Sequence, residues 1–186
     1  SGAALLLVLA LLWGAAPVVP HVLVAGVCHE VGQLVVLWCF HVPVEAVVVT
    51  SMGAVICAPG QERLSYPREL LAVLAGAGVN LLLAVIFARV SGDYLFAGAN
   101  FLLGVYNLLP VQGLDGGRAL YLLIAWRTEP FTAQRLAALV NTVVLAVLLG
   151  VSAALLYFTG SGLFCLVGAA GMIFGQFRVA KRERKR

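Results

Sequence analysis

The chain has 186 residues, of which 62% are apolar and only 11% are charged, and its mean hydropathy is +1.04. A water-soluble domain needs a charged outer shell, so this composition excludes an ordinary soluble fold and predicts an integral, multi-pass membrane protein. The net charge of +4 arises largely in residues 181–186, which carry five of the twelve Lys and Arg. A basic excess confined to the end of the chain is typical of a terminal tail, and nucleic acid is not expected as a partner.

The cysteines give no sign of a structural framework. Cys28, Cys39, Cys57 and Cys165 contain no Cys-x-x-Cys pair, and three of them lie in strongly apolar surroundings. Neither a disulfide framework nor a cysteine zinc site is therefore expected. Because Ser1 leads directly into apolar residues without a basic leader, a cleaved signal peptide is not expected either.

Six apolar segments are candidates for crossing about 30 Å of hydrocarbon, which takes a helix of roughly 20 residues. They are residues 3–16, 21–41, 68–90, 94–109, 134–158 and 163–177. The fourth breaks at Pro110, and a short helix over residues 116–126 is expected to complete it. The predicted fold class is an α-helical membrane protein with about six transmembrane helices and a small β-hairpin at the membrane surface.

Positive charge predicts the orientation, because short cytoplasmic loops are enriched in Lys and Arg. With the C-terminal tail inside, one side of the membrane carries Arg63, Arg68, Arg127 and Arg135, and Arg89 is alone on the other. Six crossings with both termini in the cytoplasm fit this distribution.

Residues 42–67 are too polar and interrupted to span. They contain two β-branched runs, at residues 47–50 and 54–56, on either side of Met52-Gly53. This pattern favours a β-hairpin at the cytoplasmic membrane surface, and an irregular interfacial loop is the alternative.

Two acidic residues fall at membrane depth, where a carboxylate costs about 2.5–3.5 kcal/mol to insert. Glu30 lies in the middle of the 21–41 segment, and Asp115 lies where the fourth crossing breaks. Asp115 alone could be an exposed helix N-cap. Since apolar residues flank it on both sides, a buried position that needs a compensating cation is the other interpretation.

His29 and Gln33 are one helical turn apart, about 6 Å along the axis and on the same face. In zinc hydrolases two histidines at this spacing hold the metal, and the intervening Glu is the general base. Here the second position is an amide, which zinc seldom selects. His21 and His41 lie about 12 and 18 Å from His29 along a continuous helix and cannot share an ion with it. Taken alone, His29 with Glu30 fits a buried hydrogen-bonded pair equally well.

Three stretches together resemble the site-2 protease family of intramembrane zinc metalloproteases (M50). They are residues 29–32 (His-Glu-Val-Gly), residues 75–80 (Ala-Gly-Ala-Gly-Val-Asn), and residues 107–110 (Asn-Leu-Leu-Pro) with 114–118 (Leu-Asp-Gly-Gly-Arg). Their order and spacing resemble the family over residues 25–126, and the compact layout is similar to its sporulation-type bacterial branch. Two positions depart from the pattern: Gln33 stands where the family has its second histidine, and Ala77 stands where a proline is usual.

The resemblance implies roles for these residues. His29 and Asp115 would be zinc ligands, and Glu30 would activate water and pass the proton to the leaving amine. Asn80 and Asn107 would lie near the zinc, where they would hold the substrate strand or polarise its carbonyl. The alternative for Asn80 is an interhelical hydrogen bond, and for Asn107 a helix cap.

The resemblance also implies one polytopic domain over residues 1–186 of a bacterial cell membrane. Its catalytic-type core would be residues 21–126, with accessory helices over 134–177 and a basic tail over 178–186. The expected partners are a transmembrane protein substrate, the lipid bilayer and a regulatory membrane protein, and the expected cofactor is Zn²⁺.

Three functions follow as hypotheses. The first is a zinc protease that cuts a transmembrane substrate near the cytoplasmic face, with an edge of the hairpin pairing with the unwound substrate. The second is a catalytically impaired pseudoprotease, with Gln33 in place of the second histidine, that binds single-span partners. The third, from another class, is a small transporter that uses His29, Glu30 and Asp115 as proton relay groups.

Overall fold

The computed structural model describes residues 17–50, 53–58 and 60–159. The expected crossings at residues 3–16 and 163–177 and the basic tail lie outside these residues. In chain order the elements are α2 (Val18–Cys39), β1 (Ala46–Thr50), β2 (Gly53–Cys57), the short 3₁₀ helix η1 (Gln61–Arg63), α3 (Tyr66–Ile86), the π-helical turn η2 (Phe87–Ser91), α4 (Tyr94–Asn107), α5 (Asp115–Ala125) and α6 (Pro130–Thr159).

Three described helices are long and apolar enough to cross a membrane: α2, α3 with η2, and α6. This finding supports a helical membrane protein. The 14 residues of α4 are fewer than the roughly 20 that a full crossing takes, so the expected number of six crossings is not established by the described residues. Many of the large side chains exposed on α2 and α3 are apolar, for example Val27, Leu82 and Val85, as hydrocarbon surroundings require.

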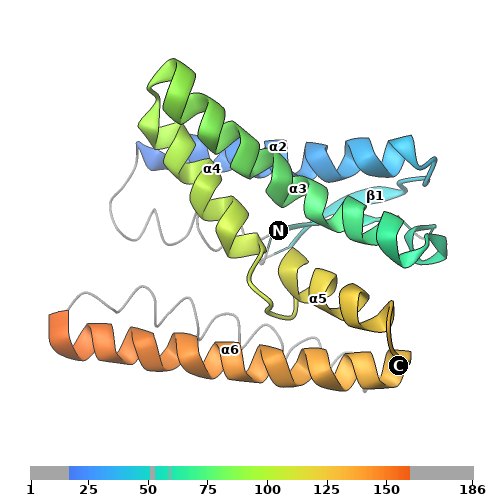
Figure 1. Cartoon of the computed structure of the whole chain (residues 1–186). Helices are drawn as coiled ribbons and strands as arrows, with labels where there is room; N and C mark the ends of the chain where they lie inside the picture. Colours follow the sequence, from blue (N-terminus) through green and yellow to red (C-terminus); the bar gives the residue numbers. More distant parts are fainter. Residues whose placement is uncertain (1–16, 51–52, 59, 160–186) are drawn as a thin grey trace.

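The helices form two groups joined by α5. Figure 1 shows α2, α3 and α4 crossing one another, with α6 running apart from them and α5 lying between. The helices α2, α3 and α4 pack on one another, α5 packs on α3, and α6 packs on α5. α5 therefore connects the three-helix group to α6.

Small residues allow the close approach of α2 to α3. A Cβ on Gly32 would come within 2.8 Å of the Val79 side chain and 3.1 Å of the Ala75 carbonyl oxygen. Interhelical contacts of this kind are common between membrane helices, which gain little from the hydrophobic effect and depend on close packing. The pairing brings the middle of α2, where His29 lies, directly against the middle of α3.

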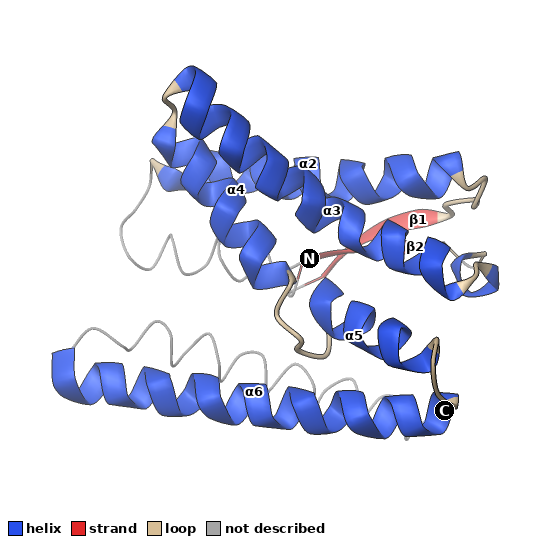
Figure 2. Ribbon diagram, in the orientation of Figure 1, coloured by secondary structure: helices blue, strands red, loops and turns tan. Residues whose placement is uncertain are grey.

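The chain between α2 and α3 contains an antiparallel strand pair (red in Figure 2). β1 and β2 pair in register from Ala46 opposite Cys57 to Thr50 opposite Gly53. The β-branched runs of the sequence thus lie in strands. The position of these strands relative to a membrane surface stays a prediction.

Candidate functional site

His29 is fully buried, and its position depends on a glycine of the neighbouring helix. A Cβ on Gly76 of α3 would lie 2.5 Å from His29 Nε2 and 2.7 Å from two ring carbons. Any larger residue at position 76 would displace the imidazole. The glycine-containing stretch in the third predicted helix therefore makes room for the His29 ring.

The turn between α4 and α5 brings Asp115 to the same place. Gly113 has a φ of +97°, a conformation that residues with a Cβ rarely adopt. Gly116 and Gly117 lie so close to the carbonyl groups of Leu108 and Val111 that neither position has room for a Cβ. These glycines fold the chain back on the end of α4, so the Asp-Gly-Gly sequence is required for the close packing that positions Asp115.

Asp115 is the first residue of α5, and its carboxylate faces α2. Its Oδ2 lies 2.8 Å from His29 Nε2 and 3.0 Å from Gln33 Nε2, and the two nitrogens are 3.3 Å apart. We call His29, Gln33 and Asp115 the Gln33 triad. The first interpretation of Asp115, an exposed N-cap, does not describe this position, because its side chain is 17% exposed and bonded to His29.

Buried amides determine which nitrogen of His29 faces the triad. Asn80 donates both of its N–H groups, to the Ala25 carbonyl at 2.9 Å and to Asn100 Oδ1 at 2.8 Å. Its own Oδ1 therefore can only accept, and it lies 2.7 Å from His29 Nδ1. Nδ1 must carry a hydrogen, and Nε2 is left to face Asp115.

Asn100 is the last residue in this series of hydrogen-bonded amide side chains. It is fully buried on α4 and donates Nδ2 to the Phe96 carbonyl, so its Oδ1 is the acceptor for Asn80. The sequence analysis did not single out Asn100. The available signal was an amide side chain within an apolar helix, which is costly in a membrane unless it is bonded.

Two other residues that the sequence analysis singled out, Glu30 and Asn107, lie in the described part of the chain. The roles expected of them stay predictions. Glu30 follows His29 on α2 and is partly buried. Asn107 is fully buried as the last residue of α4 and donates Nδ2 to the Leu103 carbonyl, one turn earlier. His21 and His41 lie near the two ends of α2, away from its middle, where His29 lies.

An ion pair that the sequence analysis missed ties α5 to α3. Arg118 donates from Nε at 3.1 Å and from Nη2 at 2.5 Å to the same oxygen of Glu69, which is buried. The two residues are 49 positions apart in the chain, and no local pattern connects them. This contact fixes the first turns of α5, and with them Asp115.

The donor atoms of the triad can be compared with those of a zinc site. Zinc bonds of about 2.0–2.1 Å in tetrahedral geometry place two ligand atoms about 3.3 Å apart. His29 Nε2 and Asp115 Oδ2 are at 2.8 Å, a hydrogen-bond distance, and Gln33 presents N–H groups, which donate and do not ligate. Over residues 17–159, apart from positions 51, 52 and 59, no group of three His, Cys, Asp or Glu could hold a metal ion. The residues present supply two zinc-type ligands and do not complete the expected three-ligand centre.

Comparison with known proteins agrees with the last of the three stretches, residues 107–118, which lies inside the matched range. Residues 93–151 match the model of peptidase family M50. The fold is similar to the structure of the site-2 protease from Methanocaldococcus jannaschii, with 22% identity, a TM-score of 0.55 and coverage of 83% of this chain and 76% of that one. No curated protein sequence matches the chain. The resemblance to the site-2 protease family is confirmed, and the sporulation-type branch stays a prediction.

Proposed function

Since the chain resembles the site-2 protease family in sequence over residues 93–151 and in fold over most of its length, we propose that it engages transmembrane partners as the intramembrane proteases of that family do. With Gln33 where the family has its second histidine, we propose that it holds an unwound stretch of a single-span membrane protein without hydrolysing it. The function is that of a site-2-type pseudoprotease.

The observation that carries this proposal is the position of the Gln33 amide. Gln33 Nε2 lies 3.0 Å from Asp115 Oδ2 and 3.4 Å from the Val73 carbonyl oxygen, and both of these atoms can only accept. The amide is therefore turned so that its N–H groups, and not its oxygen, face Asp115 and the Val73 carbonyl, with Nε2 also 3.3 Å from His29 Nε2. An N–H group in this place stabilises the carboxylate as a cation would, and it leaves no donor atom for zinc.

The hairpin supplies a way to hold the partner. A transmembrane helix must unwind to expose its backbone, and an extended backbone can add to the edge of a strand pair. β1 and β2 form a two-stranded sheet, so each has an edge that the other does not cover. We place this event near the cytoplasmic face of a bacterial cell membrane, with both termini in the cytoplasm, as the distribution of arginines predicts. A regulatory membrane protein that controls access to the hairpin is part of the proposal.

A second candidate is an active zinc protease, and the contact between His29 and Asp115 favours it. Two residues 86 positions apart in the sequence meet at 2.8 Å through the atoms that zinc would bind, and Asn80 presents the ring nitrogen suited to that task. Hydrolysis by this route requires a third ligand in place of Gln33. Among the described residues none supplies it.

Capture and cleavage of one model substrate distinguish the two candidates. The full chain and its Gln33→His variant are reconstituted with a single-span segment that carries a photo-crosslinker near its cytoplasmic end. We expect both proteins to crosslink to the segment, and only Gln33→His to cut it when zinc is supplied. Adding Glu30→Gln to that variant should abolish the cut and preserve the crosslink. Chelator-sensitive cleavage by the unaltered chain would select the second candidate, and absence of crosslinks to both proteins would reject partner binding.

A further inference from the structure

A cavity of about 420 Å³ lies where α2 ends and the chain approaches α3. We call it the Arg63 pocket. Its lining residues are Phe40, His41, Val42, Pro43, Gly60, Arg63 and Leu64. Because α2 and α3 are both long and apolar enough to span a membrane, a pocket at their adjoining ends falls at the boundary between hydrocarbon and water.

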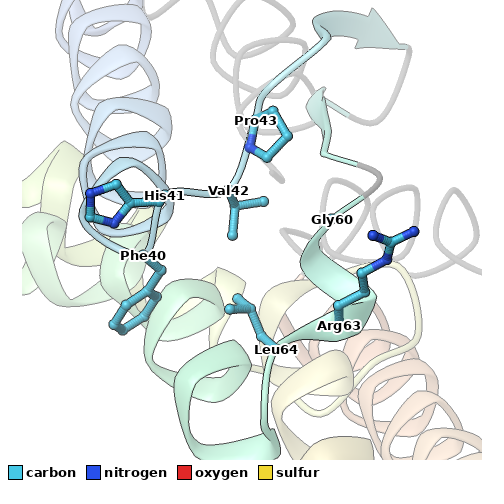
Figure 3. A pocket seen from close by; sticks show the side chains of 7 residues that line it. All are labelled: Phe40, His41, Val42, Pro43, Gly60, Arg63 and Leu64. Carbon is cyan, nitrogen blue, oxygen red and sulfur yellow. The ribbon is translucent and has the colours of Figure 1, made fainter.

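The wall of the pocket is apolar. Figure 3 shows the side chains of Val42 and Leu64 pointing toward each other between the two chain segments, with His41 on one flank and Arg63 on the other. Val42 is buried in a cluster against which Leu64 and Phe40 pack. This surface would accept the glycerol and upper acyl carbons of a lipid more readily than a hydrated ion.

The rim of the pocket is cationic. Arg63 is exposed, and Arg68 in the first turn of α3 places its guanidinium carbon 5.8 Å from the centre of the Phe40 ring. None of the seven lining residues is acidic. Glu69, next to Arg68 in the sequence, is buried and paired with Arg118. Two other acidic residues are neighbours of the lining in the sequence: Glu45, which is exposed, follows Pro43 by two positions, and Glu62 directly precedes Arg63.

An exposed aromatic residue, Trp38, precedes the first lining residue, Phe40, by two positions in the sequence. Trp38, in the last turn of α2, is 78% exposed. Tryptophan is enriched at the level of lipid headgroups, where its ring contacts hydrocarbon and its N–H contacts water. A ligand that contacts the two arginines and the apolar wall of the pocket needs one anionic end and one apolar end.

We propose that the Arg63 pocket binds the headgroup of an anionic phospholipid, with its phosphate toward Arg63 and Arg68 and its apolar part against Val42 and Leu64. Pro43 comes three residues before β1 and Gly60 three residues after β2. A bound lipid therefore holds the base of the hairpin at the membrane surface, the position from which the hairpin would reach a partner segment.

Native mass spectrometry tests this site in the full chain. The protein is released from nanodiscs that contain phosphatidylglycerol and phosphatidylcholine in equal parts, and the lipids that stay bound are counted. We expect retention of phosphatidylglycerol over phosphatidylcholine, and a loss of about fivefold for each of Arg63→Gln and Arg68→Gln. Arg63→Lys should retain the lipid, because it preserves the charge.

The matched control is Arg89→Gln, which removes an exposed arginine from η2. Three results would overturn the proposal: equal retention of the two lipids, a loss in Arg89→Gln as large as in Arg63→Gln, or displacement of the lipid by inorganic phosphate, which would assign the pocket to a soluble anion. The lipid proposal is tested independently of partner binding, because lipid retention is measured without any partner.

Discussion

At the scale of single residues, Asn80 orients the imidazole of His29 through Nδ1, whereas Asp115 faces Nε2. Asn80 uses both N–H groups on acceptors, which leaves only its oxygen for His29 Nδ1. A sequence contains the identities of these residues but not the direction in which an amide points. The pattern of residues 29–33 therefore predicted a shared helix face for His29 and Gln33, whereas the orientation of the Gln33 amide needed coordinates.

Asn100→Leu tests the chain of buried amides. The change removes the acceptor of one Asn80 N–H, which leaves a buried donor unsatisfied and costs about 1–3 kcal/mol of stability. Freed from this contact, Asn80 can turn its amide, and Nδ1 of His29 loses its fixed acceptor. The ¹⁵N chemical shift of His29 Nδ1 should change, because its hydrogen no longer has one fixed acceptor.

The control for this variant is Thr142→Val, which removes a side-chain hydrogen bond within α6. It should leave the His29 ring signals unchanged. If Asn100→Leu also leaves them unchanged, His29 is oriented without Asn100.

At the scale of elements, α5 determines whether the site forms at all, because it carries Asp115 and contacts both α3 and α6. The Arg118–Glu69 ion pair holds it to α3, and Asn141 of α6 accepts from the backbone N–H of Gln112 at 2.8 Å, just before α5. The bounds of α2 to α5 could be predicted within a few residues, since Pro, Gly and polar residues end each apolar run. The ion pair could not, because it depends on how two separate helices pack.

Arg118→Gln should destabilise the protein more than Glu69→Gln. The first change leaves a buried carboxylate without its cation, whereas the second leaves a half-exposed arginine that water can solvate. We expect losses of about 1–3 kcal/mol and less than about 1 kcal/mol, respectively. Denaturant unfolding in detergent micelles measures both, with Arg127→Gln, a change at an exposed residue just after α5, as control. Equal losses would show that α5 does not depend on this pair.

At the scale of the whole molecule, α2, α3 and α4 pack on one another, and α6 packs on α5 and on the turn before it, where Asn141 accepts from Gln112. Composition was sufficient to predict a helical membrane protein, because hydrocarbon permits few alternatives for a chain of this hydropathy. The number of crossings could not be decided in the same way. The 14 residues of α4 reach less than a bilayer's depth, and composition does not show how the remaining distance is covered.

Deleting residues 47–49 tests the role of the hairpin in holding a partner. The deletion removes most of β1 and with it the edge that would pair with an extended segment. We expect loss of crosslinking to the model single-span segment, while the protein stays in the membrane fraction after alkaline extraction. Val47→Thr, which preserves a β-branched residue in the strand, should crosslink normally. Undiminished crosslinking after the deletion would remove the hairpin from the proposed function.

The most direct measurement is the zinc content of the full chain beside that of Gln33→His, both purified from membranes, exposed to zinc and then freed of excess metal. If the Gln33 amide takes the place of the third ligand, the unaltered chain holds much less than one zinc per protein, and Gln33→His holds about one. Gln33→Glu, which supplies a carboxylate at the same position, should recover part of the binding. One tightly held zinc in the unaltered chain would contradict the account, because His29 and Asp115 would then form a metal centre in spite of Gln33.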